Sequence, residues 1–411
     1  MVLPSRQTRA EAPPEGLFDS FFLGGFECST HRRRDGRRLD LLAATGHDRA
    51  VALDYAAILE HGIRSVRDGV RWHLIETAPG RYDWSSFLPM LRAAEEVGVQ
   101  VIWDLCHYGW PDHLDIWRPC FVDGFARFAA AVATIVREET DRAPLWCPIN
   151  EISYWAWAGG TVARFNPNAR GRGAELKHQL VRASIAAIEA VWSVDPRARI
   201  VHIDPVINVV PRSTRPQGLL AAEAHRQAQF EAWDMLAGWS WPGLGGRPAY
   251  LDVIGVNYYS DNQWFVGGRT IRLGHARYRP FREMLAETYQ RYQRPMFIAE
   301  TGGEGAIRVP WLRYVAEEVR AALAGGIPIE GICLYPVVDY PGWTNLRHCQ
   351  VGLLGPLDER GRRAIYLPLA EELRRQQALF DDQIAVHGLL PPAKPAGAVL
   401  TAGRAVRMHR R

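Results

Sequence analysis

Short apolar runs, each about the length of one strand, recur along the chain from residue 21 to residue 338. They lie at residues 21–27, 65–70, 101–107, 145–151, 199–206, 252–259, 296–301 and 331–338. Between them apolar residues recur at a helical period, most clearly at 87–98, 121–139, 180–192 and 311–326, and several of these stretches end in glycine, a preferred helix C-cap. Strands that alternate with helices predict an α/β fold with parallel strands. A count of eight predicts a (β/α)8 barrel, the TIM barrel.

An open, doubly wound sheet is the structural alternative for the same order of elements. Such a sheet usually carries a glycine-rich phosphate loop after an early strand, and the sequence GGFE at residues 24–27 does not match the GxGxxG pattern. We therefore expect a single barrel domain at residues 17–385. The polar residues 1–16 and the Pro/Ala/Arg-rich residues 386–411 are expected to form loosely ordered N- and C-terminal tails.

Composition fits a globular protein and excludes several other classes. Of the 411 residues 47% are apolar, and the net charge of +4 gives no reason to expect a nucleic acid partner. The six cysteines have no CxxC spacing, which argues against a disulfide framework and against structural zinc. No secretory signal is visible, and no uninterrupted apolar stretch approaches ~20 residues, the length of a membrane span. We expect a cytoplasmic protein without a membrane partner, metal or cofactor; the oligomeric state stays open.

Polar and ionisable residues stand where the predicted strands end. They are Glu27, Arg67, His107, Asn150, Glu151, His202, Asp204, Asn257, Tyr259, Glu300 and Asp339. In a (β/α)8 barrel the carboxyl ends of all strands open onto one face, where active sites lie. Solvated loops would not repeat this arrangement at nearly every strand, so the pattern predicts a catalytic site on that face.

Two glutamates of this set form a candidate catalytic pair. Glu151 ends the fourth predicted strand and Glu300 ends the seventh, so we expect the side chains to face each other from opposite sides of the barrel mouth. Two carboxyl groups across a cleft can hydrolyse an acetal, because one protonates the leaving oxygen while the other attacks the anomeric carbon. The pair needs one protonated and one ionised member, and Arg67 is available to favour the ionised nucleophile.

The motifs around these glutamates resemble those of the retaining (β/α)8 glycoside hydrolases, most closely glycoside hydrolase family 1, the β-glucosidase family. CPINEI at residues 147–152 resembles the Asn-Glu pair that ends strand 4 in this clan, which implies that Glu151 is the acid/base and that Asn150 contacts the sugar 2-hydroxyl. FIAETGG at 297–303 resembles the family motif ITENG, which implies that Glu300 is the nucleophile. The resemblance runs from about residue 20 to residue 381 and implies a retaining β-glycosidase.

Other motifs imply the supporting residues. HYGWP at 107–111 resembles HWDLP, whose histidine contacts the sugar, which implies the same for His107. GIRSVRDGVRW and LDVIGVNYYS resemble GIKAYRFSISW and LGINYYS, which implies that Arg67 and Tyr259 contact the nucleophile and that Asn257 lies at the substrate. GICLYPVVDYPGW at 331–343 aligns with GYFVWSLLDNFEW. This alignment implies that Tyr335 and Trp343 bind substrate.

The chain departs from the family at two positions whose side chains contact sugar hydroxyls in the family. The family reads glucose hydroxyls with a glutamine where this chain has Glu27, and with a glutamate where it has Gly342. A simple glucose preference is therefore not implied, and the sugar, aglycone and linkage stay open. The strand 8 tryptophan, which precedes a cis peptide in the family, is replaced by Tyr335 followed by Pro336. We predict a cis Tyr335–Pro336 bond, because the cis form costs little before proline.

Structural interpretations of these residues remain open at this stage. Glu151 could cap the next helix, and His107 could be an ordinary core histidine. Asn257 and Tyr259 could be structural. Glu27 could contact substrate or form a buried ion pair with an arginine.

The function also has alternatives. Glu304, four residues past Glu300, competes for the role of nucleophile, although it falls in the loop beyond the strand. A transglycosidase would use the same carboxylate pair with an acceptor other than water. A catalytically silent sugar-binding barrel would retain binding without turnover. In each case the expected partner is a small-molecule glycoside or oligosaccharide.

Overall fold

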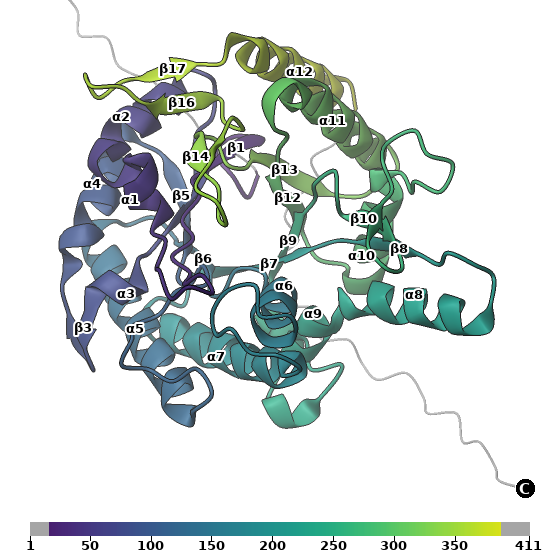
Figure 1. Ribbon diagram of the computed structural model, residues 1–411. Helices are drawn as coiled ribbons and strands as arrows, with labels where there is room; N and C mark the ends of the chain where they lie inside the picture. Colours follow the sequence, from purple (N-terminus) through teal and green to yellow (C-terminus); the bar gives the residue numbers. More distant parts are fainter. Residues whose placement is uncertain (1–15, 388–411) are drawn as a thin grey trace, which may run out of the picture.

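Eight parallel strands close into a barrel in the computed structural model, which describes residues 16–387 (Figure 1). The strands are β1 (Phe22–Gly25), β2 (Ser65–Gly69), β5 (Gln100–Asp104), β6 (Leu145–Cys147), β7 (Arg199–Pro205), β9 (Val253–Asn257), β12 (Met296–Thr301) and β13 (Ile329–Leu334). Neighbouring barrel strands follow one another in sequence, and β13 closes the ring by pairing with β1. The predicted TIM barrel is confirmed, and each predicted apolar run supplies one barrel strand.

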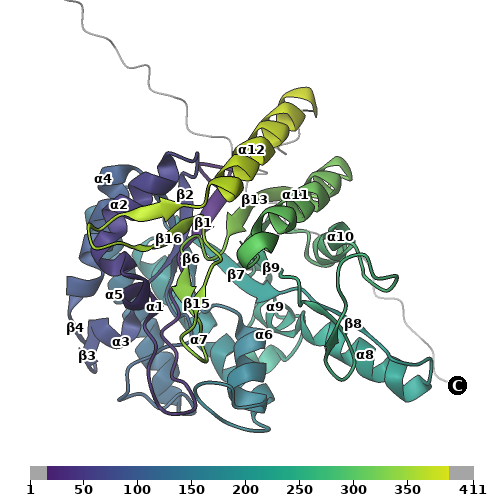
Figure 2. The same ribbon diagram turned by 45° about the horizontal axis from the view of Figure 1, so that its top comes forward.

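Helices surround the barrel and cover its outer face (Figures 1 and 2). They are α1 (Leu41–Thr45), α2 (His47–Leu59), α3 (Trp72–Ile75), α4 (Leu88–Val97), α5 (Pro119–Glu139), α6 (Ile152–Trp155), α7 (Gly173–Val194), α8 (Pro216–Ala228), α9 (Glu231–Leu236), α10 (Phe281–Tyr292), α11 (Arg308–Ala324) and α12 (Leu367–His387). A π-helical turn at Ala156–Thr161 and short 3-10 turns at Trp84–Ser86, Pro242–Leu244, Pro248–Tyr250 and Gly305–Ile307 complete the helical elements. The four helical stretches expected from periodicity correspond to α4, α5, α7 and α11. Gly98 ends α4 in the left-handed conformation that favours glycine.

The apolar residues form two clusters. One fills the barrel interior and includes Leu23, Ile102, Val201 and Phe297. The larger one lies between the barrel and its helices, where Trp72 contacts Phe128 of α5 at 5.2 Å between ring centroids. Both clusters fix the strand ends, and with them the side chains of the candidate site.

Short sheets decorate the barrel. They comprise β3 (Glu76–Ala78) with β4 (Arg81–Tyr82), β8 (Asn208–Val210) with β10 (Gln263–Phe265) and β11 (Arg269–Thr270), β14 (Tyr340–Pro341) with β15 (His348–Cys349), and β16 (Leu354–Leu357) with β17 (Arg363–Ile365). The β14–β15 hairpin directly precedes and follows the loop that carries Trp343. It therefore belongs to the rim of the candidate site.

Within residues 16–387 one helix, α5, is long and apolar enough in composition to match a membrane span. Asp123 and Arg127 interrupt its apolar sequence, in line with the expectation of no uninterrupted apolar stretch. Its buried residues include Phe121, Phe125 and Phe128, which lie against the ring of Trp72. In this structure α5 is a wall helix of the barrel.

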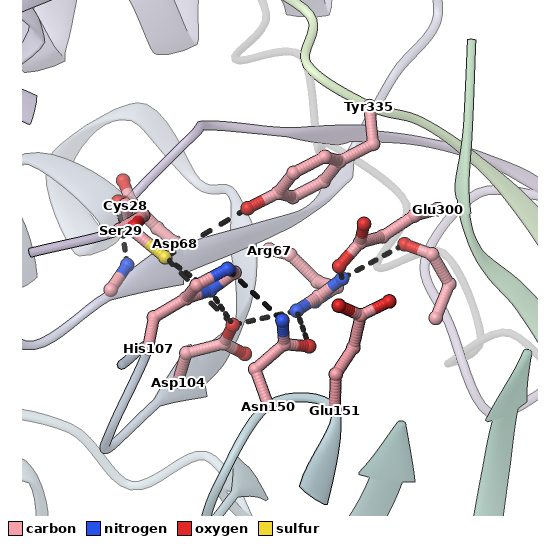
Figure 3. A network of polar contacts seen from close by, with 12 residues as sticks. Cys28, Ser29, Arg67, Asp68, Asp104, His107, Asn150, Glu151, Glu300 and Tyr335 are labelled. Carbon is pink, nitrogen blue, oxygen red and sulfur yellow. Dashed lines mark hydrogen bonds and ion pairs between the residues drawn. The ribbon is translucent and has the colours of Figure 1, made fainter. Parts of the chain in front are cut away.

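Two details differ from the sequence-based expectation. Strand β6 ends at Cys147 rather than at residue 151, because the chain turns at Pro148 and reaches Glu151 with a positive φ. The strands β6 and β12 are not on opposite sides of the barrel, since only β7 and β9 separate them. The two strands are thus three positions apart around the ring rather than exactly opposite, although the side chains of Glu151 and Glu300 are directed into one space (Figure 3).

Other expectations concern single bonds and the ends of the chain. The Tyr335–Pro336 bond is cis, as predicted. All six cysteines lie within the described residues and none forms a disulfide. The predicted tails fall almost entirely on residues 1–15 and 388–411, which lie outside the described residues.

Candidate active site

The structure brings the predicted catalytic pair and its supporting residues together at one end of the barrel (Figure 3). Arg67 lies in β2 and Glu300 in β12, whereas Glu151 and Tyr259 lie just beyond β6 and β9. Figure 3 shows the carboxyl groups of Glu151 and Glu300 directed into the same space beside the guanidinium of Arg67. Both glutamates are buried, with exposed fractions of 9% and 6%.

Glu300 has a cationic partner. Its Oε1 accepts a hydrogen bond of 2.9 Å from Nη1 of Arg67, and its Oε2 accepts one of 3.0 Å from the hydroxyl of Tyr259. Nη2 of Arg67 donates to Asp104 at 2.6 Å and to Oδ1 of Asn150 at 3.0 Å. Arg67 therefore holds Glu300 in a fixed orientation and neutralises part of its charge.

Within residues 16–387, Glu151 has no cationic partner. Its Oε1 accepts a hydrogen bond of 2.8 Å from Nδ2 of Asn257, and its Oε2 accepts one from the hydroxyl of Tyr108. Burial and the charge of Glu300 raise the pKa of Glu151 to about 8, although the bonds from Tyr108 and Asn257 act in the opposite direction. Two glutamates in one cluster thus have unequal environments, and Glu151 is the member that retains its proton near neutral pH.

The backbone around Glu151 is held from the neighbouring strand. Glu151 adopts φ 47° and ψ 60°, a left-handed conformation that is uncommon for a residue other than glycine. Its N–H donates to the carbonyl oxygen of Ile203 in β7 at 2.9 Å. At the next residue of β7, the carboxylate of Asp204 accepts hydrogen bonds of 3.0 and 3.1 Å from the N–H of Ser153 in α6. Asp204, which the strand-end pattern included, thus anchors the first turn of the helix after Glu151.

A buried hydrogen-bonded chain lies beside the pair. Arg67 only donates, so its bond to Oδ1 of Asn150 directs Nδ2 of Asn150 toward Nε2 of His107, 3.0 Å away. The amide nitrogen also only donates, so Nε2 of His107 is an acceptor and Nδ1 carries the proton, which it donates to Asp104 at 2.9 Å. Both ring nitrogens of His107 thus have partners within the protein, and its contact with a sugar stays a prediction.

The sequence-based analysis missed Asp104 and Tyr108. Asp104 is the last residue of β5 and is fully buried against Arg67 and His107. Tyr108 is also fully buried and accepts a bond of 3.1 Å from Asn150 in addition to donating to Glu151. Its φ of 66° turns the side chain back toward the cluster. An acid inside the apolar run at residues 101–107 was a signal for Asp104, whereas nothing in the sequence indicated the backbone turn at Tyr108.

The residues predicted to bind substrate line the same region. Tyr335 lies under the guanidinium of Arg67, 5.0 Å from ring centroid to Cζ. Gly25 makes this position possible, because a Cβ there would lie 2.0 Å from Cδ2 of Tyr335. The indole ring of Trp343 lies 5.6 Å from the ring of Tyr108, and its buried Nε1 has no hydrogen-bond partner among residues 16–387. Asn257 contacts Glu151, so its contact with substrate also stays a prediction.

Glu27 lies at the edge of this cluster without an arginine. Its Oε1 accepts a hydrogen bond of 3.0 Å from the N–H of Ser29 and lies 4.0 Å from Nε2 of His107. No ion pair joins Glu27 to an arginine in the described part of the chain, so the alternative of a buried Glu–Arg pair was wrong. Burial raises the pKa of Glu27 to about 7, and the charge of Glu300 contributes to the increase.

The remaining strand-end residues lie outside the cluster. His202 bonds the carbonyl oxygen of Tyr250 at 2.9 Å, and Asp339 accepts bonds of 2.8 Å from the N–H groups of residues 351 and 352. Glu304 is exposed and forms a salt bridge with Arg347. Its position argues against Glu304 as the nucleophile.

One group of side chains has metal-ligating atoms close together. Cys28, Asp104 and His107 each offer one such atom within 4.8 Å of the others. However, Asp104 already forms a salt bridge with Arg67, and the same oxygen accepts the proton of His107. Burial raises the pKa of the Cys28 thiol well above its usual value, which disfavours the thiolate that binds metals. These residues fit a neutral hydrogen-bonded network better than a metal site.

Comparison with known proteins points to one family. A family model described as Glycosyl hydrolase family 1 matches residues 89–238, which include Asn150 and Glu151. Over these residues the chain is similar to glycosyl hydrolase family 1, from which it diverges in sequence. This similarity supports a glycoside hydrolase.

The family 1 relatives are distant. The chain is 21% identical to 6-phospho-beta-glucosidase AscB of Escherichia coli over 70% of its own length and 73% of the relative. It is also 21% identical to aryl-phospho-beta-D-glucosidase BglC of Bacillus subtilis, over 74% and 79% of the two chains. Among solved structures, the AHE enzyme from Alicyclobacillus herbarius and a Thermotoga maritima beta-glucosidase in complex with glucoimidazole both give a TM-score of 0.71, at 17% and 15% identity. Each alignment covers 90% of this chain and 98% of the other, which shows the shared fold.

Proposed function

We propose that this chain hydrolyses a β-linked glycoside with retention of configuration, with Glu300 as nucleophile and Glu151 as acid/base. The observation that carries the proposal is the unequal environment of two buried glutamates in one cluster. Glu300 is paired with Arg67, whereas Glu151 has only neutral hydrogen-bond donors and a raised pKa. Double displacement needs this combination of an ionised and a protonated carboxyl group.

The first step forms a glycosyl-enzyme. An oxygen of Glu300 attacks the anomeric carbon while the bond from this carbon to the leaving oxygen breaks, and the proton of Glu151 passes to the leaving oxygen. In the second step Glu151 removes a proton from water, the water oxygen attacks the anomeric carbon, and Glu300 is released. Arg67 and Tyr259 orient Glu300 in both steps, and Asn150 supports the sugar 2-hydroxyl.

Azide rescue of Glu151→Ala tests the two roles. A dinitrophenyl glycoside has a leaving group that needs no proton, so this variant should still form the glycosyl-enzyme but release it slowly. Azide needs no general base, and we expect it to accelerate turnover and to yield a β-glycosyl azide. If azide does not accelerate turnover, or if the product is an α-glycosyl azide, the proposed roles are contradicted.

Two matched variants, Glu300→Ala and Glu304→Ala, test which of these glutamates is the nucleophile. Glu300→Ala should lower kcat by about 10³-fold or more. Glu304→Ala removes the nearby exposed glutamate and should retain activity close to that of the wild type. A chain that binds glycosides but turns over none of a nitrophenyl glycoside panel would instead be the catalytically silent barrel.

Transglycosylation is a second candidate because aromatic side chains follow Glu151. Tyr154 lies 5.8 Å from Trp157 and 6.2 Å from Phe165 between ring centroids, and Phe165 lies 5.8 Å from Trp343. An apolar acceptor side favours an organic alcohol over water. The ratio of glycosylated acceptor to free sugar during turnover distinguishes the two reactions.

A further inference from the structure

Glu27 carries a buried carboxylate oxygen that the described residues leave without a donor. Only 6% of the residue is exposed, and its single hydrogen bond joins Oε1 to the N–H of Ser29. Its second oxygen, Oε2, accepts no hydrogen bond from residues 16–387. This oxygen is still accessible to solvent. This oxygen is therefore available to a ligand that enters the cluster.

The position of Glu27 places this oxygen at the sugar site. Its charge contributes to the raised pKa of Tyr259, which contacts the proposed nucleophile, and to that of Tyr335. Its Oε1 lies 4.0 Å from His107, the neighbour of Asn150. Glu27 thus faces the same space as the proposed catalytic pair.

Among residues 16–387 no lysine or arginine forms an ion pair with Glu27. Arg67 is the nearest cation and is already paired with Asp104 and Glu300. Nε2 of His107 lies 3.0 Å from the amide nitrogen of Asn150 and 4.0 Å from Oε1 of Glu27, too far for a hydrogen bond to Glu27. Gly342, on the loop before Trp343, supplies no side chain at all. Burial disfavours the charged form of Glu27 and raises its pKa to about 7, and a ligand with a positive charge would stabilise the ionised carboxylate.

We propose that the sugar on the nonreducing side of the scissile bond carries an ammonium group that pairs with Glu27. The inference rests on the proposed glycosidase function and names its substrate class: β-glycosides of amino sugars. An ammonium group gives Glu27 a charge-assisted hydrogen bond, whereas a sugar hydroxyl leaves the carboxylate charge uncompensated. The glutamate therefore selects for a basic nitrogen on the ring.

Matched substrates test the proposal in the full-length protein. We compare kcat/KM for nitrophenyl β-glycosides with that for isosteres in which an amino group replaces the hydroxyl at C2, C3 or C4, at a pH at which the amine is protonated. The wild type should prefer one amino glycoside over its parent by tenfold or more. Glu27→Gln keeps the shape of the side chain but removes its charge. It should lower this preference at least tenfold, while kcat/KM for the parent glycoside stays within about threefold of the wild-type value.

Controls distinguish this inference from the function on which it rests. Glu138→Gln, which removes one exposed carboxylate from α5, should leave the preference unchanged. The wild type could hydrolyse the neutral glycosides and hydrolyse every amino isostere more slowly. This result would overturn the inference but not the glycosidase function. An unchanged preference in Glu27→Gln would also overturn it. Absence of turnover on all substrates would overturn the proposed function itself. The wild-type comparison alone decides the matter if Glu27→Gln does not fold.

Discussion

The protonation state of Glu151 determines how the proposed reaction depends on pH. Burial and the charge of Glu300 raise its pKa to about 8, and Glu151 must be protonated to act as an acid. The active form is therefore present below this pKa and is lost as the pH rises through it. For a substrate with a poor leaving group, kcat/KM should fall on the alkaline side near pH 8.

Tyr108→Phe should move this alkaline limb to higher pH. The Tyr108 hydroxyl donates to the carboxylate of Glu151 and lowers its pKa, so removal of the hydroxyl raises the pKa further. We expect a shift of about one pH unit, equivalent to about 1.4 kcal/mol, measured from the pH dependence of kcat/KM. Tyr258→Phe is the matched control, because the Tyr258 hydroxyl bonds Tyr278 and Gln263. An unshifted limb in Tyr108→Phe, or an equal shift in both variants, would count against this role.

Single residues show where sequence-based reasoning succeeds and where it stops. Glu151, Glu300 and Arg67 could be found because each stands at a strand end within a family motif. Tyr108 could not, because its contact with Glu151 depends on a backbone turn with positive φ. The partners of His107 depend on hydrogen-bond directions that only the folded structure defines.

At the level of elements, the junction between β6 and α6 sets the position of Glu151. The sequence predicted a strand through residue 151, but the chain leaves the barrel after Cys147. Pro148 has no N–H to continue the strand ladder, and Glu151 adopts a left-handed conformation. Apolar periodicity continues through this turn because Ile149 remains buried, so the pattern alone could not locate the strand end.

Asp204→Ala should weaken this junction. The carboxylate of Asp204 accepts from the N–H of Ser153 in the first turn of α6, and loss of such a cap costs about 1–2 kcal/mol. We expect a lower unfolding free energy together with a lower kcat, because Glu151 precedes this turn. Asp204→Asn retains an acceptor and should restore most of both quantities. A loss of stability with unchanged kcat would show that the anchor does not position Glu151.

The whole molecule could be predicted as a closed barrel because eight strand runs recur with helices between them. The sequence did not indicate how the C-terminal hairpin is attached to the N-terminal half. His47 of α2 lies between Asp54 and Asp68 at 2.7 and 2.8 Å, and Arg363 of β17 pairs with Asp54 at 2.6 Å. These residues are far apart in the sequence and form one buried ionic cluster.

This cluster should make global stability depend on pH. Burial alone would lower the pKa of His47, but Asp68 and Asp54 outweigh it and raise the pKa from 6.5 to about 9. A pKa raised on folding stabilises the protein fully below pH 6.5, and this stabilisation is lost as the pH rises through about 9. The loss is on the order of 3 kcal/mol. His47→Gln should therefore show a flatter pH dependence of the unfolding free energy over this range than the wild type, and equal slopes would contradict the charged cluster.

Covalent trapping with a 2-fluoro glycoside tests the central claim, a glycosyl-enzyme on Glu300, most directly. Fluorine at C2 slows both steps, and a dinitrophenolate leaving group keeps the first step fast, so the intermediate accumulates and adds the mass of one fluorosugar to the protein. A panel that includes glucosyl and amino-substituted sugars, followed by peptide mass analysis, identifies the modified residue. The account predicts one adduct, on the peptide that contains Glu300, and none in Glu300→Ala. An adduct on Glu151 or Glu304, or turnover of the parent glycosides without any adduct, would contradict it.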